Sequence, residues 1–299
     1  MTRSIGEQMV RANGVDLCAQ TFGDPADPAI LLIAGAAGSM LGWEDEFCER
    51  LAAGSRFVIR YDHRDTGRSV SYAPGAPPYT FRDLAEDSVG LLDALSLGGA
   101  HFVGLSMGGG IAQLVALEHP DRVASLMLLA TSPFAPRPDG PELPSMSEAF
   151  LAYASGAQSP DWTDRAAVID FIVAAMRMMS GESPDFDDAA ARDFAGRDVD
   201  RTVNVASNQL NHFAIDGGDP ILGHVGEIRA PTLVIHGARD PVFPPGHGVA
   251  LAQEIPGARL LALDEMGHEL PRAVWDTVIS AILRHTSGGG GDGVTRSHH

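Results

Sequence analysis

The stretch that decides the fold of this chain is HFVGLSMGGG, residues 101–110. Its first half, 101–105, is an apolar run with strand character that meets a Gly-x-Ser-x-Gly pentapeptide, and helix-forming residues follow. This order predicts a strand, a sharp turn that carries Ser106, and a helix. Gly104 and Gly108 would relieve the crowding of such a turn. The serine Oγ would then be exposed above a sheet, beside the N–H groups that begin the helix.

The pentapeptide alone is weak evidence, because the chain contains 34 glycines and a chance match is common. Its strand-and-helix setting is what favours a nucleophilic Ser106 over an ordinary turn.

Strands and helices alternate on both sides of this stretch. Asn13-Gly14, between two segments with strand character, predicts a type I′ hairpin, and the residues from Thr80 to Asp83 resemble a capping box. The predicted strands are 7–11, 15–22, 29–34, 57–61, 101–105, 123–130, 231–236 and 259–263, and the predicted helices are 43–53, 80–95, 111–118, 247–254 and 274–285. This alternation predicts an α/β fold with a mostly parallel, eight-stranded sheet and helices on both faces.

The alternation stops at 132–225, directly after the sixth strand. This segment contains Pro-rich loops and helical stretches without a convincing buried strand. An insertion at that place would cover the edge of the sheet where ligands bind, so it predicts a helical cap, or lid. The core domain would then consist of 1–131 and 226–286. Residues 287–299 would be a disordered tail that ends in a probable tag remnant.

A serine nucleophile needs a base, and the base needs an acid that fixes its tautomer. Asp240 follows the strand 231–236, and His268 follows the strand 259–263. Both loops are expected at the sheet edge that carries Ser106, and the order Ser, Asp, His is that of such sites. The sequence therefore predicts a Ser106–His268–Asp240 triad.

Each partner has a simpler interpretation taken alone, since an Asp beside Pro is usually a turn residue and a His after Gly is usually on the surface. Other residues could also supply the base or the acid. The rival bases are His212, His224 and His236, and the rival acids are Asp264, Glu265 and Glu269. We expect His236 to order the Asp240 loop and His63 to be structural.

The loop 35–39, Gly-Ala-Ala-Gly-Ser, follows the third strand. Its small residues would let the backbone approach a ligand, so the N–H groups of Ala36 and Met107 are the predicted oxyanion-hole donors. The alternative is a simple strand-to-helix turn. Ala37, Met176 and Met179 are candidates for the substrate pocket, although apolar residues of a lid are more often core.

Composition excludes several classes of partner. The formal net charge of −18 argues against nucleic acid and anionic membrane surfaces. Cys18 and Cys48 have no metal or redox spacing, and the sequence contains no transmembrane-length apolar segment, metal-binding His motif or nucleotide-binding Gly motif. We therefore expect a reduced, cytoplasmic protein, a monomer or homodimer, that acts on a small molecule without a metal or cofactor.

These residues resemble a known superfamily over nearly the whole folded length. The loop 34–38, the turn 62–69, the elbow 104–108, Asp240 and Gly267-His268 are similar to the α/β-hydrolase superfamily. The resemblance implies the α/β-hydrolase fold and acyl transfer by the triad. This chain has Ala34-Gly35 where the wider family usually has His-Gly, and Asp65 where it often has Gly.

Three further stretches, 22–28, 41–47 and 61–69, look like the aclacinomycin methylesterase group, whose members hydrolyse a methyl ester of anthracycline polyketides. The resemblance implies a serine esterase that cleaves carboxylic esters, with a bulky polyketide-like methyl ester as a candidate substrate. Two alternatives stay open for the same triad. One is cofactor-free perhydrolase, haloperoxidase or C–C bond hydrolase chemistry, and the other is a non-catalytic binding protein with this fold.

Overall fold

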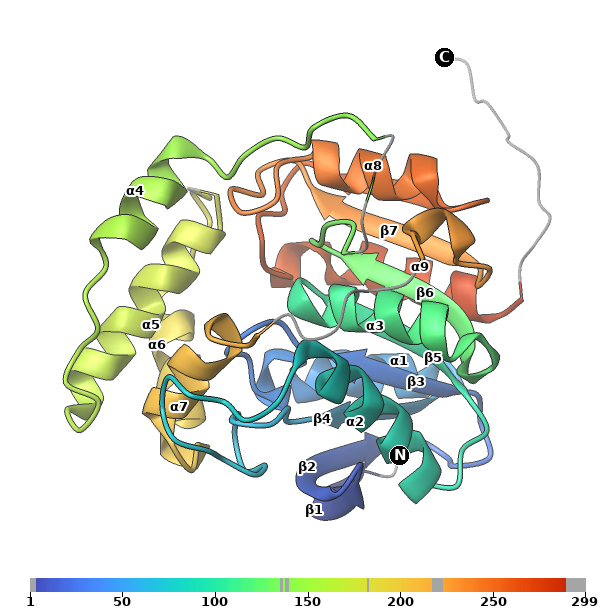
Figure 1. The fold of residues 1–299 in the computed structure, drawn as a ribbon, viewed down its shortest axis with the longest axis horizontal. Helices are drawn as coiled ribbons and strands as arrows, with labels where there is room; N and C mark the ends of the chain where they lie inside the picture. The colour runs from blue at the N-terminus through green and yellow to red at the C-terminus, as the bar shows by residue number, and fades with distance from the viewer. Residues whose placement is uncertain (1–3, 135–136, 138–139, 182, 217–222, 289–299) are drawn as a thin grey trace.

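Eight strands form one sheet in the computed structural model, which describes residues 4–134, 137, 140–181, 183–216 and 223–288 (Figure 1). The strands, in sheet order, are β1 (Ser4–Ala12), β2 (Val15–Phe22), β4 (Phe57–Tyr61), β3 (Ala29–Ile33), β5 (Ala100–Leu105), β6 (Val123–Leu129), β7 (Thr232–Gly237) and β8 (Arg259–Leu263). β2 pairs antiparallel with β1 and β4, and the other neighbouring pairs of this described sheet are parallel. The predicted eight-stranded, mostly parallel sheet is confirmed. The predicted tail at 287–299 lies, from residue 289 on, outside the described residues.

Local sequence accounts for the ends of several elements. Asn13 and Gly14 have φ angles of 44° and 75°, which form the predicted tight turn between β1 and β2. The capping box at α2 is also confirmed, because the Thr80 side chain accepts from the Asp83 N–H and the Asp83 carboxylate accepts from the Thr80 N–H. The predicted helix at 43–53 begins two residues late, at Asp45.

Helices cover both faces of the sheet (Figure 1). Alternate residues of one strand enter different cores: Phe102 of β5 packs with α2, α3 and α8, whereas Val103 packs with α1 and α9. These helices are α1 (Asp45–Ala53), α2 (Phe81–Ala94), α3 (Met107–Glu118), α8 (Gly246–Glu254) and α9 (Trp275–Thr286). Short 3₁₀ turns occur at Met40–Gly42, Pro120–Arg122, Asn211–Phe213, Val225–Glu227 and Arg272–Val274.

The helices of the cap segment, as we call residues 132–225, lie to one side of the sheet (Figure 1). These helices are α4 (Glu148–Gly156), α5 (Arg165–Met179), α6 (Asp188–Arg201) and α7 (Val205–Leu210), and the described part of the segment contributes no strand to the sheet. α5 and α6 share a small core of their own, formed by Ile169, Val173, Ala191 and Ala195. Among the described residues, no helix has both the length and the apolar character needed to cross a membrane.

Candidate active site

Ser106 sits on a strained turn between β5 and α3. Its φ is 53° and its ψ is −117°, a backbone conformation that is uncommon for a residue with a side chain. The turn is tied down on several sides: the Ser106 N–H donates to Leu129 O at 2.9 Å, and the Ser106 carbonyl accepts from the Thr131 hydroxyl at 2.8 Å and from the Gly109 N–H at 2.9 Å. The surrounding structure therefore compensates for the strain and leaves the side chain partly exposed.

Gly104 and Gly108 make this turn possible. A Cβ added at Gly104 would lie 2.2 Å from the carbonyl oxygen of Gly108, and one added at Gly108 would lie 2.3 Å from the carbonyl oxygen of Ile33. Neither position tolerates a methyl group, because the obstructing atoms belong to the backbone of α3 and β3.

The structure brings the three predicted triad residues into contact. His268 Nε2 lies 2.8 Å from Ser106 Oγ, and His268 Nδ1 lies 2.9 Å from Asp240 Oδ2. Asp240 and His268 are buried, with exposed fractions of 3% and 7%. The loops after β7 and β8 thus place an acid and a base beside the turn after β5, at one edge of the sheet.

Neighbouring groups fix the orientation of both partners. The Asp240 carboxylate accepts from the N–H groups of Val242 and Phe243, at 2.9 and 2.8 Å. The Phe243 ring packs edge-on against the His268 imidazole, with 5.4 Å between ring centroids. The backbone N–H of His268 donates to the backbone carbonyl of Met179, at the end of α5, at 2.7 Å. Residues of the cap segment and of the core thus both hold the Ser106–His268–Asp240 cluster.

The other histidines that were considered make different contacts. His236 Nε2 lies 2.7 Å from Phe243 O and 3.7 Å from Asp240 Oδ2, so His236 braces the Asp240 loop as expected. His63 is fully buried with Nε2 3.1 Å from Ala34 O, and burial lowers its pKa to about 3. His212 contacts backbone groups, and the exposed His224 accepts from the Gly226 N–H.

Of the rival acids, Asp264 and Glu265 are exposed. Glu269 folds back toward its own turn, where burial raises the pKa of its carboxyl to about 7 against the opposing effect of the Glu269 and Gly267 backbone N–H groups. Asp240 is therefore the carboxylate that contacts the His268 ring.

The loop 35–39 passes directly beside Ser106. A Cβ at Gly35 would lie 3.4 Å from the Ser106 Cβ, and the Gly38 N–H donates to Gly35 O at 3.1 Å, which closes a turn around Ala36 and Ala37. Met107 is the first residue of α3, where a backbone N–H has no carbonyl partner within the helix. Both predicted oxyanion donors thus belong to backbone next to the serine.

The pocket candidates have different surroundings. Ala37 lies in the loop beside Ser106, and Met179 contacts His268 through its carbonyl. Met176 packs against the core shared by α5 and α6. Within the described ranges, no group of three or more His, Cys, Asp or Glu side chains is arranged to hold a metal ion.

A sequence profile described as the alpha/beta hydrolase fold matches residues 28–271. The chain belongs to the alpha/beta hydrolase family. The match extends from β3 to beyond His268, and so it includes every residue of the Ser106–His268–Asp240 cluster.

Relatives of this alpha/beta hydrolase include two enzymes from Streptomyces. The chain is 36% identical to the rhodomycin D methylesterase DauP of Streptomyces sp. (strain C5) and 35% identical to DnrP of Streptomyces peucetius, with 93% of this chain and 97% of each relative covered. Among solved structures, the esterase RhEst1 from Rhodococcus sp. ECU1013 superposes with a TM-score of 0.74 at 22% identity, covering 96% of this chain and all of RhEst1. That likeness shows the fold.

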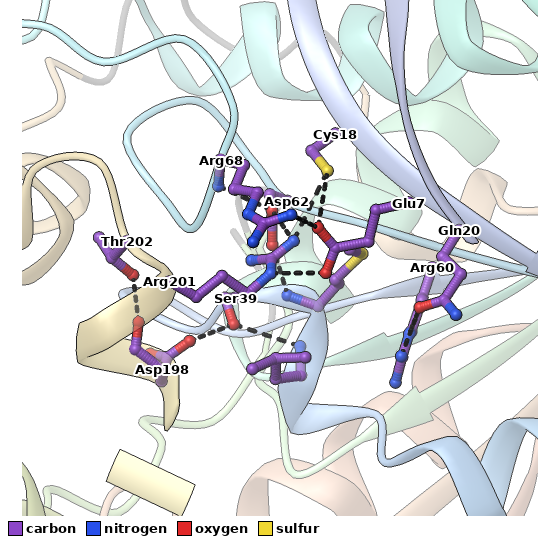
Figure 2. Close-up of polar contacts among 12 residues, drawn as sticks. Glu7, Cys18, Gln20, Ser39, Arg60, Asp62, Arg68, Asp198, Arg201 and Thr202 are labelled. Carbon is purple, nitrogen blue, oxygen red and sulfur yellow. Dashed lines mark hydrogen bonds and ion pairs between the residues drawn. The ribbon is translucent and has the colours of Figure 1, made fainter. Parts of the chain in front are cut away.

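A buried polar cluster beside the site was not predicted from the sequence (Figure 2). Asp62 accepts from the Met40 N–H at 2.8 Å, from the Arg68 N–H at 3.0 Å and from the Arg201 guanidinium at 2.7 Å. Arg201, at the end of α6, also donates to Glu7 of β1 at 2.8 Å. From the sequence, the turn 62–69 was noted only for its family resemblance, and its partner in the cap segment, Arg201, carries no sequence signal.

Proposed function

We infer that this protein is a serine hydrolase of carboxylic esters with Ser106 as the nucleophile. The single observation that carries this inference is the chain of contacts from Ser106 Oγ through the His268 ring to Asp240, at 2.8 and 2.9 Å. The match to two methylesterases over 93% of the chain supports an ester as the substrate. A carboxylic ester hydrolase is thus the function that fits best.

In the proposed reaction, His268 Nε2 takes the hydroxyl proton as Ser106 Oγ attacks the ester carbonyl, and a tetrahedral oxyanion forms. The N–H groups of Met107 and Ala36 donate to that oxyanion, and a donor of this kind typically contributes about 3 kcal/mol. The alkoxide leaves with the proton from His268. Water, deprotonated by the same nitrogen, then attacks the acyl-enzyme and releases the acid and Ser106.

The proposed substrate is a methyl ester of a bulky, ring-bearing acid. The methylesterase relatives are named for rhodomycin D, and the cap segment of this chain places α5 against the His268 loop. We propose that residues 132–225 act as the lid over the acyl group. Faster hydrolysis of ring-bearing methyl esters than of methyl acetate is expected, and equal rates would contradict this assignment.

The test of the nucleophile is Ser106→Ala. The variant is expected to lose ester hydrolysis by at least about 10⁴-fold and to resist labelling by a fluorophosphonate, since the group that forms the acyl-enzyme is gone. Ser96→Ala is a matched control, because Ser96 is an exposed serine that also has a positive φ, 58°, far from the site in the turn after α2. Full activity of Ser106→Ala, or dominant peroxide-dependent halogenation by the parent enzyme, would overturn the proposal.

A further inference from the structure

The loop that carries the Ala36 N–H is held by two residues of the cap segment. The Ala37 N–H donates to His212 Nδ1 at 3.0 Å, and the Ala37 carbonyl accepts from Asn208 Nδ2 at 2.8 Å. Both side chains are buried, with exposed fractions of 7% and 2%. Two side chains from α7 and the 3₁₀ turn that follows it thus bind both backbone polar groups of one loop residue.

Ala37 needs such support, because its φ is 58°. It occupies the third position of the turn closed by Gly38 N–H and Gly35 O, where a positive φ favours glycine. A side chain in this conformation is strained, and the strain persists only where neighbours hold it. The peptide between Ala36 and Ala37 shares the Ala36 Cα with the peptide that carries the Ala36 N–H, so fixing Ala37 limits the directions in which the donor beside Ser106 can point.

The tautomer of His212 matches this task. Its Nε2 lies 2.9 Å from the carbonyl oxygen of Arg64, so Nε2 carries the proton and Nδ1 is an acceptor. Burial lowers the pKa of His212 to about 4, so the ring stays neutral near pH 7. The Ala37 N–H therefore meets a lone pair whose position is fixed by a second hydrogen bond.

Asn208 gives an independent argument. Its Nδ2 donates to Ala37, but its Oδ1 is buried without a hydrogen-bond partner among the described residues. A buried, unpaired carbonyl oxygen is costly, so stability alone does not favour an amide here over an apolar side chain of the same shape. The hydrogen bond from Asn208 to the Ala37 carbonyl offers a reason for an asparagine at this position.

We propose that His212 and Asn208 are positioning residues of the reaction: they hold Ala37 so that the N–H group before it stays aimed at the reacting ester oxygen. This inference rests on the proposed function, because it assumes attack by Ser106. It makes the cap segment part of the oxyanion hole as well as a cover for the substrate.

Two substitutions at His212 separate its contacts. In His212→Asn, the amide oxygen takes the place of Nδ1 and keeps an acceptor for Ala37, whereas in His212→Gln the amide nitrogen takes the place of Nε2 and keeps only the donor to Arg64. We expect His212→Gln to lower kcat for p-nitrophenyl butyrate at least tenfold with KM within about threefold, and His212→Asn to keep kcat within about threefold. Asn208→Leu should also lower kcat at least tenfold while its Tm equals or exceeds that of the parent.

The outcomes distinguish a failure of the proposed function from a failure of the positioning role. If the parent enzyme shows no Ser106-dependent hydrolysis, the proposed function fails and this inference fails with it. If hydrolysis depends on Ser106 but His212→Gln and Asn208→Leu keep kcat within about twofold, the positioning role alone is wrong. Equal losses in His212→Gln and His212→Asn, or losses that follow the folded fraction seen by circular dichroism, also overturn it.

Discussion

At the scale of single residues, Asp240 has two tasks that use different parts of its carboxylate. Oδ1 accepts from the N–H groups of Val242 and Phe243 and so shapes its own loop, while Oδ2 lies nearest His268 Nδ1, at 2.9 Å. The first task needs only an acceptor oxygen. In the proposed reaction, the second needs an acceptor toward the imidazole, because only then does Nδ1 carry the proton and Nε2 stay free to take one from Ser106.

Asp240→Asn separates these tasks. Asparagine keeps an oxygen for the two N–H groups but presents an amide donor to His268, which favours the tautomer that cannot act as a base. We expect kcat to fall by about 10³ to 10⁴ with an unchanged circular dichroism spectrum. Asp264→Asn, at an exposed neighbour of the His268 loop, should keep full activity. A kcat for Asp240→Asn within tenfold of the parent would contradict the assigned role.

Gly104→Ala tests the elbow itself. The new methyl group would lie 2.2 Å from the Gly108 carbonyl oxygen, so β5 and α3 would have to separate. We expect a loss of about 2 to 4 kcal/mol in the free energy of unfolding, measured with urea, because overpacking against backbone cannot be relieved by a rotamer change. Gly98→Ala, where nothing lies within 4 Å of the added Cβ, should change stability by less than about 0.5 kcal/mol. Similar values for both variants would show that the turn tolerates a side chain.

The proximity of Ser106, His268 and Asp240 was predictable from the sequence, whereas the contacts that hold the loop 35–39 were not. Ser106, Asp240 and His268 each follow a strand that could be recognised, and parallel strands end at one edge, so their proximity follows from topology. His212 and Asn208 lie 175 and 171 positions from Ala37 along the chain. Their partners are the backbone N–H and carbonyl groups of an alanine, and no sequence pattern identifies such partners. His212 was considered only as a rival base.

At the scale of elements, most core strands and helices lie within two residues of their predicted positions, because hydrophobic runs and turn residues mark them locally. The exceptions are β1, which begins three residues before its predicted start, and α3, which begins four residues before, at Met107. β4 and β8 have the predicted bounds, and α2 begins at its capping box. The helices of the cap segment could not be placed individually. α4 has no buried residue and α6 packs through alanines, so neither shows a clear apolar stripe. Their positions depend on contacts with core loops.

One such contact predicts a pH-dependent stability for α6. Asp198 accepts a hydrogen bond from the Ser39 hydroxyl, and burial together with the charge of Asp62 raises the pKa of its carboxyl to about 6, against the opposing effect of that hydrogen bond and of Arg201. The folded protein thus holds this proton more tightly than the unfolded chain, whose Asp pKa is about 3.9. The resulting stabilisation is full below about pH 4 and is lost as the pH rises through about 6.

Asp198→Asn should remove this dependence, since the amide is neutral at every pH and keeps an oxygen for Ser39. We expect the variant to unfold with a free energy about 1 to 3 kcal/mol higher than the parent at pH 8, and with no difference at pH 4. Asp193→Asn, on the same helix in an exposed pair with Arg197, should shift stability by less than about 1 kcal/mol at pH 8. A parent enzyme more stable than Asp198→Asn at pH 8 would reverse the sign and refute the argument.

At the scale of the whole molecule, the cap segment is hydrogen-bonded to three loops that the proposed site uses and to the turn 62–69. Its contacts are Ser147 N–H with Pro241 O at the Asp240 loop, Met179 O with the His268 N–H, His212 Nδ1 with the Ala37 N–H, and Arg201 with Asp62 at the turn 62–69. The proposed lid and these loops are therefore one connected structure. Loosening one of these contacts is expected to affect the proposed site as well as the cap segment.

One of these connections is the ion pair of Arg201 with Asp62 and Glu7 (Figure 2), which joins α6, the turn 62–69 and β1. The guanidinium is 7% exposed and the Asp62 side chain is fully buried. Arg201→Met would leave the Asp62 carboxylate buried with its charge uncompensated. In the described part of the chain, the other hydrogen-bond donors to this carboxylate are the backbone N–H groups of Met40 and Arg68, which carry no net charge. Removing one partner of a buried pair typically costs about 3 to 5 kcal/mol.

Urea unfolding of Arg201→Met should show a loss of that size, and 1 M NaCl should change it little, since buried charges are poorly screened. Arg165→Met is the matched control from the same cap segment: Arg165 pairs with Asp200 while both side chains are more than half exposed, at 57% and 58%. Its loss should be much smaller than that of Arg201→Met and should disappear in salt, because an exposed pair gains little beyond what water already provides. Equal, salt-sensitive losses in the two variants would mean that Arg201 behaves as a surface arginine and that the cap segment is not anchored through Asp62.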